Sequence, residues 1–427
     1  MLLALTTVCF ALAMTHRAPC MEEHWSGNAR YAAMCYSDIP YLYTWRGFAE
    51  QQWPYVESRY EGMEYPPVIA YTAWVVSKAV ALNPQGPPAH LRTSTEIGSL
   101  WGLDAMTQEV NQYFVLTSLV LVLAALASTW LLARVHPGRP WDAAGFAASP
   151  MLMLTALINW DLLAIVFIAG ALWAWQRLSG HTRAVVTGLF IGLGTATKLY
   201  PLFLLGGILV ICLHRRRLLE FAVTIGAAVA AWCLAQVPAW FGDWDRWTLF
   251  WTFNADRGAD LGSVWMVLQQ AGYTFTASQI NSASWFLFAL ACVGVLLLGV
   301  RAKRTPQLAQ LGFLIVLAFL IVNKVYSPQY VLWLLPLAVM ARPRWRDLLI
   351  WQAGEAVYFA AVWLYLGGWL GDAGDDGATA YSVAILTRIA AQLYFAVRVI
   401  GDIRSVDDDP VDVGRGEPAP HADLVAH

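Results

Sequence analysis

The stretch that decides the fold is YFVLTSLVLVLAALASTWLL, residues 113–132, which contains no charged side chain. A run of about 20 apolar residues is the length that an α-helix needs to cross the hydrocarbon core of a bilayer. The run is followed by Arg134, His136 and Arg139. Because basic loops stay in the cytoplasm, this helix is predicted to run from outside to inside.

The composition agrees with a membrane protein. Of the 427 residues, 58% are apolar and 13% are charged, whereas about 25% of the residues in soluble domains are charged. The net charge of -2 provides no electrostatic basis for binding nucleic acid. The six cysteines form no CxxC pair, and no metal-ligand cluster is seen in the sequence, so we expect no cofactor.

Basic clusters recur at every second turn of the predicted membrane path, which gives the topology. The further apolar runs cover roughly 142–159, 160–176, 184–198, 201–213, 218–238, 284–300, 307–322, 330–341, 346–366 and 381–400. Together with an inside-to-outside helix at 1–14, they predict about twelve transmembrane helices with both termini in the cytoplasm. We therefore expect an all-α polytopic protein of the cytoplasmic (plasma) membrane, with one transmembrane domain at 1–401 and a disordered cytoplasmic tail at 402–427.

The N-terminal part leaves alternatives open. The run 1–14 is short for a span and also resembles a secretory signal sequence, although no positive charge precedes it. Residues 16–108 are predicted to form the first external loop, with aromatic-rich helices at 41–53 and 66–82, the second of which does not cross. Cys20 and Cys35 lie in this loop, where an oxidising compartment permits a disulfide that the spacing alone does not establish.

The polar clusters all lie on the predicted outer side, at 37–38, 64–67, 159–161, 198–201, 254–257 and 323–330. Three short apolar runs, 184–198, 201–213 and 330–341, meet polar turns that contain proline. Irregular backbone at membrane depth is stable only where protein or a wet cavity satisfies it. These turns are therefore predicted to line a cavity that opens outward.

Sugar transfer from a lipid phosphate suits these clusters. A phosphate leaving group needs no general acid, so one carboxylate suffices to deprotonate the acceptor hydroxyl, whereas glycosidases use a pair of carboxyl groups. Positive charge must stabilise the phosphate as the bond breaks. Lys198 and Lys324 each lie near a tyrosine and a proline at a predicted outer helix end, and Arg257 adds a guanidinium that pairs with phosphate oxygens.

The motifs CYSDIP (35–40), Tyr65-Pro66, NWD (159–161), GTATKLYP (194–201) and KVYSPQYVLW (324–333) resemble those of glycosyltransferase family 87, the polyprenol-phosphate-mannose-dependent mannosyltransferases of actinobacteria. The resemblance covers about residues 1–340. It implies a GT-C fold with juxtamembrane helices in the first external loop, and an aspartate of that loop, here Asp38, as the catalytic base. It further implies α-1,2-mannosyl transfer to phosphatidylinositol mannosides or lipoglycans.

The candidate site residues follow from these motifs, and each has a rival interpretation. Asp38 is the predicted base, and a helix cap is its structural alternative. Lysines at helix ends also reach the interface without binding a ligand. The predicted phosphate- and donor-binding residues are Lys198, Tyr200, Lys324, Tyr326 and Arg257, and the further candidates are Glu64 (a second possible base, or the partner of an arginine), Asp161 (a buried structural residue) and Gln329.

The predicted activity is an inverting transfer of mannose from polyprenyl-phosphate-mannose to a lipid-linked or glycan acceptor on the outer face. One alternative is the same fold with another polyprenyl-phosphate sugar as donor. A second alternative is a transporter or flippase of lipid-linked glycans, although the repeated halves typical of transporters are not seen. The expected partners are the donor lipid, the acceptor and membrane lipids.

Overall fold

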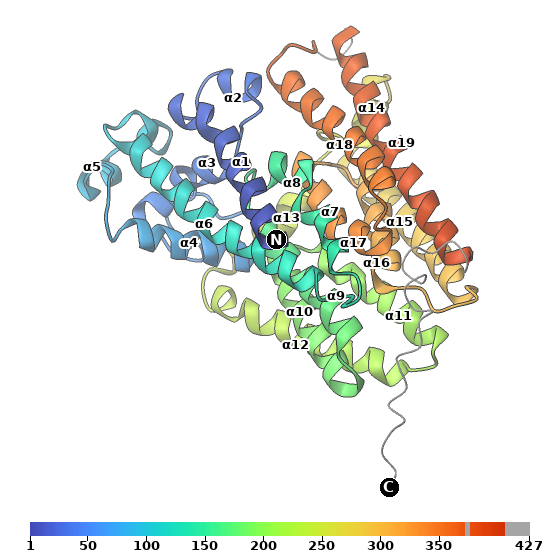
Figure 1. Ribbon diagram of the computed structural model, residues 1–427. Helices are drawn as coiled ribbons and strands as arrows, with labels where there is room; N and C mark the ends of the chain where they lie inside the picture. The colour runs from blue at the N-terminus through green and yellow to red at the C-terminus, as the bar shows by residue number, and fades with distance from the viewer. Residues whose placement is uncertain (372–375, 406–427) are drawn as a thin grey trace.

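The computed structural model describes residues 1–371 and 376–405, and the regular structure within them is helical (Figure 1). Six helices are long and apolar enough to cross a bilayer: α1 (Leu2–Glu22), α6 (Met106–Leu132), α12 (Leu218–Trp240), α15 (Ala277–Val300), α18 (Trp345–Leu366) and α19 (Asp376–Arg404). Shorter apolar helices pack among them: α4 (Pro67–Val80), α9 (Leu162–Arg177), α11 (Leu204–His214), α16 (Leu308–Val322) and α17 (Val331–Ala341). The chain is therefore a multi-pass membrane protein.

The segment between α1 and α6 consists of short helices. They are α2 (Ala29–Ala32), α3 (Asp38–Trp45), η1 (Phe48–Glu50), α4, α5 (Ala89–Ser94) and η2 (Ile97–Gly102). The helix expected at 41–53 is wrong in its bounds: it begins at Asp38 and ends before Gly47, whose positive φ of 75° starts a turn. A helix of 14 residues such as α4 spans about 21 Å, less than the hydrocarbon core of about 30 Å.

Helix α1 corrects the expectation of a short first span. It continues past the apolar run 1–14 to Glu22, through Arg17, which is fully buried and donates to the Leu154 carbonyl over 2.8 Å. Internal polar contacts thus extend the helix beyond the hydrophobic run. A disulfide joins Cys20 to Cys35, so the bond that the sequence permits is present in the structure. It fixes the start of α3 to the end of α1.

The apolar run 142–159 is not one helix, contrary to the sequence-based expectation. It divides into η3 (Pro140–Ala143), α7 (Ala144–Ala147) and α8 (Pro150–Thr155), followed by a turn that leads into α9. Ser149 explains the break, because its hydroxyl accepts from the Leu152 N–H and caps α8 with Pro150 in the first position. The turn after α8 carries the 159–161 motif.

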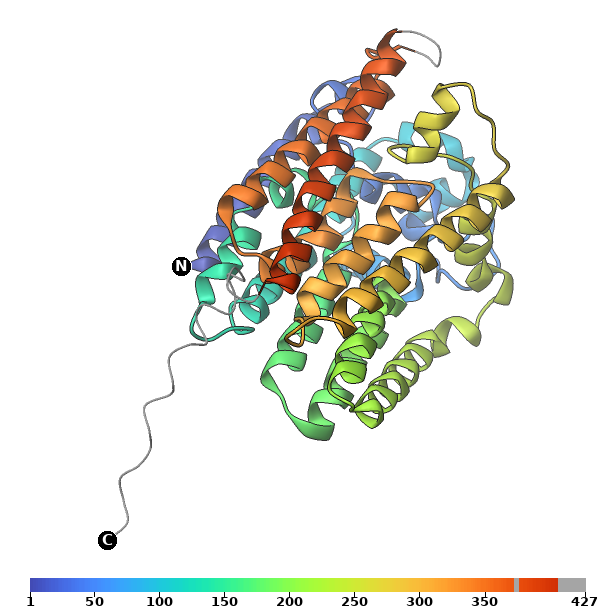
Figure 2. The ribbon, with the colours of Figure 1, turned by 90° about the vertical axis from the view of Figure 1, so that its right-hand side faces the viewer.

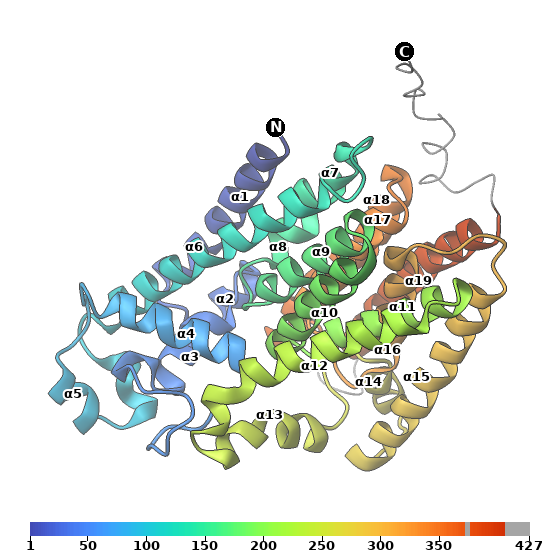
Figure 3. The same cartoon turned by 90° about the horizontal axis from the view of Figure 1, so that it is seen from below.

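The loops rich in arginine and lysine gather at one end of the helical bundle. In Figure 3 the N-terminus, the α6–α7 and α17–α18 connections and the α11–α12 and α15–α16 connections lie toward the upper right. Helix α5 lies at the lower left, and α13 (Trp244–Asp256) and the start of α15 lie along the bottom. Figure 2 shows the same separation, with α14 (Val264–Gln270) and the end of α18 away from the α9–α10 and α11–α12 connections. This matches the alternation of basic loops along the chain.

Helix α10 (Gly180–Thr197) packs against α12 through two glycines four residues apart. A Cβ atom on Gly188 would overlap the Thr224 carbonyl oxygen, and one on Gly192 would overlap that of Ala228. Small residues at this spacing let two membrane helices approach backbone to backbone. We call this contact the glycine seam. It fixes α12, and therefore the chain that continues into α13, relative to α10.

The last helix extends past residue 402, where the cytoplasmic tail is predicted to begin. Helix α19 continues to Arg404, because Asp402 is buried and ion-paired with Arg342 at the end of α17. Arg342 also donates from Nε to Asp347 of α18 over 2.6 Å. The three side chains hold together the end of α17, the start of α18 and the end of α19. The rest of the predicted tail lies outside the described residues.

Candidate active site

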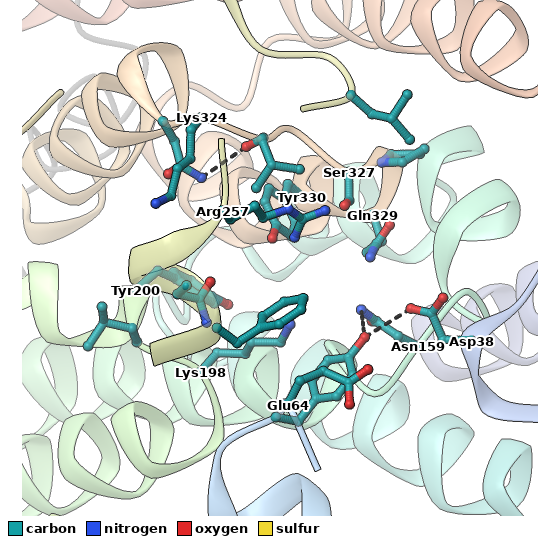
Figure 4. Close-up of a pocket in the computed structure, with 18 of the residues that line it drawn as sticks. Asp38, Glu64, Asn159, Lys198, Tyr200, Arg257, Lys324, Ser327, Gln329 and Tyr330 are labelled. Carbon is teal, nitrogen blue, oxygen red and sulfur yellow. Dashed lines mark hydrogen bonds between the residues drawn. The ribbon is translucent and has the colours of Figure 1, made fainter. Parts of the chain in front are cut away.

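A cavity of about 730 Å³ lies among the helix ends opposite the basic loops (Figure 4). Its polar wall contains the turn after α8, the α10–η4 turn (η4 is Tyr200–Phe203) and the turn before η5 (Pro328–Tyr330), together with α3 and the segment before α4. The expectation that the proline-containing turns line a cavity is therefore confirmed. Its other wall is formed by aromatic side chains of α13, α15 and α16: Phe250, Trp251, Phe253, Trp285, Phe288 and Phe319.

Asp38 lines this cavity as the first residue of α3. The helix cap is Ser37, whose hydroxyl accepts from the Ile39 N–H over 3.3 Å. The Asp38 N–H donates to the Ile158 carbonyl over 2.7 Å, and the Ser37 hydroxyl donates to the same oxygen over 3.2 Å. The capping alternative for Asp38 is thus excluded, because the neighbouring serine performs that role. The Asp38 carboxyl is left facing the cavity.

Two tyrosines hold the Asp38 carboxyl. The Tyr65 hydroxyl donates to Oδ2 over 2.9 Å, and the Tyr36 hydroxyl also hydrogen-bonds the carboxyl. The amide of Asn159 donates to the Tyr65 oxygen over 3.4 Å, which orients the Tyr65 proton toward Asp38. Burial raises the pKa of Asp38 to about 6, and the two tyrosine hydrogen bonds oppose that rise by stabilising the carboxylate. At neutral pH the group is therefore ionised and basic enough to accept a proton.

Lys198 lies beside this group, at the end of α10. Its ammonium is 3.0 Å from Oδ1 of Asp161, whose Oδ2 accepts from the Trp333 indole N–H over 2.9 Å. The ammonium also lies 4.5 Å from the centre of the Tyr65 ring and 5.7 Å from that of Trp333. Asp161 is only 1% exposed. The predicted site residue Asp161 thus contacts the predicted phosphate ligand Lys198, and Tyr65 connects both to Asp38.

The Tyr200 ring stacks on the indole ring of Trp333. The two rings are parallel within 6°, with centres 4.3 Å apart. Tyr200 lines the cavity, and its buried hydroxyl has no hydrogen-bond partner within the part of the chain that the structure describes. An unpaired buried hydroxyl is costly, so this oxygen is available to a ligand.

Lys324 lies on the α16–η5 turn and lines the same cavity. Its ammonium donates to Oδ1 of Asn281 over 2.6 Å and to the Ala255 carbonyl over 3.2 Å. Burial, and then the nearby Arg257 guanidinium, lower the pKa of Lys324. Arg257 also lines the cavity, and its Nε donates to Asp260 over 2.6 Å. Lys324 and Arg257 thus lie together, and within the described residues the hydrogen bonds of Lys324 go to neutral oxygens, while Asp256 acts on its charge from nearby. An anionic ligand would stabilise this pair of cations.

The remaining predicted residues lie in different places. Glu64 lines the cavity and accepts from Arg46 Nε over 2.8 Å, so the arginine-pairing interpretation describes its contact. Gln329 lines the cavity and is 5% exposed, with its Oε1 unpaired among the described residues. Tyr326 is different, because it is fully buried and its hydroxyl donates to Glu355 over 3.0 Å. It lies behind the cavity wall rather than among the lining residues.

Three residues of the site were missed by the sequence analysis as site residues. Tyr36 and Tyr65 contact Asp38, and Trp333 contacts Asp161. All three were present in the quoted motifs. Tyr36 and Tyr65 lie within two positions of a carboxylate residue, which was the available signal, whereas Trp333 lies nine positions from Lys324 and carried no such signal. Among the described residues no group of three or more His, Cys, Asp or Glu side chains forms a metal site. The cavity therefore brings the carboxyl groups of Asp38 and Glu64 and the cations Lys198, Arg257 and Lys324 around one space.

The model of glycosyltransferase family 87 matches residues 108–328, just over half of the chain. No curated protein gives a match. Among solved structures, the crystal structure of ArnT from Cupriavidus metallidurans bound to undecaprenyl phosphate is similar with 14% sequence identity and a TM-score of 0.42. That similarity covers 93% of this chain and 77% of the ArnT chain.

Proposed function

The chain belongs to glycosyltransferase family 87, and from this premise we propose that it transfers mannose from polyprenyl-phosphate-mannose to a lipid-linked or glycan acceptor, with inversion at the anomeric carbon. The observation that carries the proposal is the shared cavity of Asp38, held by Tyr65, and Lys198, 4.5 Å from the same tyrosine ring. A base at the hydroxyl of one tyrosine and a cation over the face of the same ring suit the two ends of a displacement reaction.

In the proposed reaction the acceptor oxygen attacks the anomeric carbon, and the bond from that carbon to the phosphate oxygen breaks. The acceptor proton moves to the Asp38 carboxylate, and the electron pair of the broken bond leaves with the polyprenyl phosphate. Because the leaving phosphate is a weak base, no second carboxyl group is required. Tyr65 and Tyr36 position the carboxylate and keep it ionised at neutral pH.

The cations of the cavity are proposed to hold the donor phosphate. Lys198 is buried and fixed by Asp161, so its charge is pre-organised for the developing phosphate anion. Lys324 and Arg257 lie on the neighbouring turns, where the Arg257 Nη1 remains for a phosphate because Nε and Nη2 contact Asp260. The free hydroxyl of Tyr200 is the proposed neutral donor. Gln329 adds an amide directed to the same space.

The aromatic wall suits the isoprenoid chain of the donor. Phe250 and Phe253 come from α13 and Trp285 from α15, and part of this wall continues to the exposed surface, since Trp285 is 54% exposed. A lipid chain leaving the cavity here would lie on apolar rings. We extend the proposal to a GT-C fold, an active site on the external face and an α-1,2 linkage to a phosphatidylinositol mannoside or lipoglycan acceptor. The support for the face is the position of the cavity opposite the basic loops.

The experiment is a transfer assay on membranes that contain the protein, with radiolabelled polyprenyl-phospho-mannose and a lipid extract. The expected result is a labelled glycolipid that is absent with the Asp38→Asn variant. The same membranes given polyprenyl-phospho-glucose or a polyprenyl-phospho-pentose test the other donors. Transfer from one of these donors, with none from the mannosyl donor, would replace mannose in the proposal.

A further inference from the structure

A group of aromatic rings lies at the Asp38 end of the cavity and has no role in the reaction described above. Tyr31, Tyr36, Tyr41 and Trp363, here called the tyrosine cluster, all line the cavity. Tyr36 is central, with ring centres 5.3 Å from Tyr41, 5.4 Å from Trp363 and 6.3 Å from Tyr31. Tyr36 also hydrogen-bonds the Asp38 carboxyl. The cluster is therefore continuous with the proposed base.

The rings are held in place from outside the cavity. Arg30 donates from Nη1 to the Tyr41 hydroxyl over 2.9 Å, and its guanidinium lies 4.8 Å from the centre of the Tyr31 ring. The Tyr41 hydroxyl in turn donates to the Trp25 carbonyl. Tyr31 belongs to α2, inside the loop closed by the Cys20–Cys35 disulfide. Rigid rings lose little conformational entropy when a ligand packs on them.

The chemistry of this end differs from that of the opposite wall. The wall of α13, α15 and α16 presents phenylalanine and tryptophan side chains to the cavity, which suits a hydrocarbon chain. The tyrosine cluster contacts Asp38 through Tyr36, and Glu64 and Asn159 line the same cavity, so its ligand meets both ring faces and hydrogen-bonding groups. A pyranose has that character, because one face carries C–H groups that pack on π-electrons while its edge carries hydroxyls. A lipid tail would leave the polar groups unpaired.

We propose that the tyrosine cluster is the acceptor subsite and that the acceptor presents a carbohydrate ring there, with one ring hydroxyl directed to Asp38. This rests on the proposed function for the role of Asp38. Tyr31 and Trp363 provide the stacking surface, with their rings within 21° of parallel and their centres 6.3 Å apart. Tyr36 connects that surface to the carboxylate.

A binding experiment tests the subsite without requiring turnover. The full-length protein in lipid nanodiscs is mixed with methyl α-D-mannopyranoside, and saturation is transferred by NMR from the aromatic protons of the protein to the sugar. We expect saturation of the carbon-bound ring protons, with much less for glycerol, which has hydroxyls but no ring. Tyr31→Ala should weaken the sugar signal, and Tyr31→Phe, which keeps the ring, should retain it. Tyr273→Ala is the matched control and should leave the signal unchanged, because the Tyr273 side chain is 61% exposed and does not line the cavity. Equal sugar signals in all four proteins, or an equal signal from glycerol, would overturn the proposal.

Kinetics with the same sugar as acceptor separate this inference from the proposed function. Tyr31→Ala and Trp363→Leu should raise the acceptor KM about tenfold, the size expected for one lost ring contact, with a much smaller change in the donor KM. A rise in the donor KM alone would assign the cluster to the donor and refute the subsite. If the sugar binds as expected but no mannosyl donor is used, the acceptor subsite stands and the proposed donor fails.

Discussion

The pH dependence of transfer tests the proposed base most directly, and Tyr65→Phe is the informative substitution. It keeps the ring that lies 4.5 Å from Lys198 but removes the hydroxyl that donates to Asp38. That hydrogen bond stabilises the carboxylate, so its loss raises the pKa of Asp38 further above its usual range. Glu64 also raises this pKa and Lys198 lowers it, and the substitution changes neither residue.

The magnitude follows from the strength of the bond. A pKa of about 6 leaves Asp38 roughly nine-tenths ionised at pH 7 and roughly one-tenth ionised at pH 5. A hydrogen bond to a charged group contributes about 1.5–3 kcal/mol, which corresponds to at least about one pH unit. In the Tyr65→Phe variant the acid limb of kcat/KM should therefore move from near pH 6 to about pH 7 or above. Between pH 7 and pH 8.5 the kcat/KM of the variant should therefore rise by a larger factor than that of the wild type.

The assay is the rate of mannosyl transfer from pH 4.5 to pH 8.5 at subsaturating donor, with Asp38→Asn as the second variant. Asn keeps the size of the side chain but cannot accept the proton, so the rate should fall by about 10²–10⁴. A thermal unfolding curve of each variant controls for folding. An acid limb that stays in place in Tyr65→Phe would refute the reasoning. Near wild-type transfer by a folded Asp38→Asn protein would also refute it and make Glu64 the candidate base.

Three further predictions concern the cations, the disulfide and the topology. Lys324→Ala should raise the donor KM about tenfold with little loss of stability, because the partners of Lys324 are neutral oxygens. Lys198→Ala should raise the donor KM and also destabilise the fold by about 3–5 kcal/mol, since it leaves the buried Asp161 carboxylate unpaired. Equal melting temperatures of the two variants would contradict this difference. Cys35→Ser should cost about 3 kcal/mol for a bridge that spans 15 residues, and an unchanged unfolding midpoint without reductant would argue against a stabilising bridge. Single cysteines placed at the exposed positions Gln85 and Lys303 should react with an impermeant reagent from opposite faces of the membrane, Gln85 from outside and Lys303 from inside. Labelling of both cysteines from the same face would show that α4 crosses the membrane.

The sequence predicted the membrane-spanning character and the position of the basic loops well, because both depend on local composition. Hydrophobic runs and positive charges are read along the chain without knowledge of contacts. It predicted the broken run 142–159 poorly, because Ser149 and the turn that carries Asn159 interrupt the helix although the neighbouring side chains are apolar. It also ended α19 too early, because the partner of Asp402 is Arg342, sixty residues away.

The candidate site shows the same limit. The motifs identified Asp38, Lys198 and Lys324, which all line one cavity, but they did not distinguish Tyr326, whose side chain contacts Glu355 behind the wall. Alternate residues of a turn point in different directions, so motif membership does not decide which of them reach a ligand. The sequence did not predict that Trp363 belongs to the tyrosine cluster, because its neighbours Tyr31 and Tyr36 lie more than three hundred positions earlier.

The glycine seam has a consequence for how this sequence can diverge. Helix α12 leads directly into α13, whose rings line the cavity, while Gly188 and Gly192 contact α12 from α10. One added methyl group in the seam separates the two backbones, since packed interiors do not absorb such a volume. The displacement of α12 would then reach the aromatic wall of the cavity, although neither glycine lines the cavity. Under the proposed function, selection on donor chain length can therefore act through substitutions in a remote helix pair. An added Cβ at either glycine meets a carbonyl oxygen of α12, at Thr224 or Ala228, which no side-chain change removes, so a larger residue at either position should be accepted only with a shift of the helix.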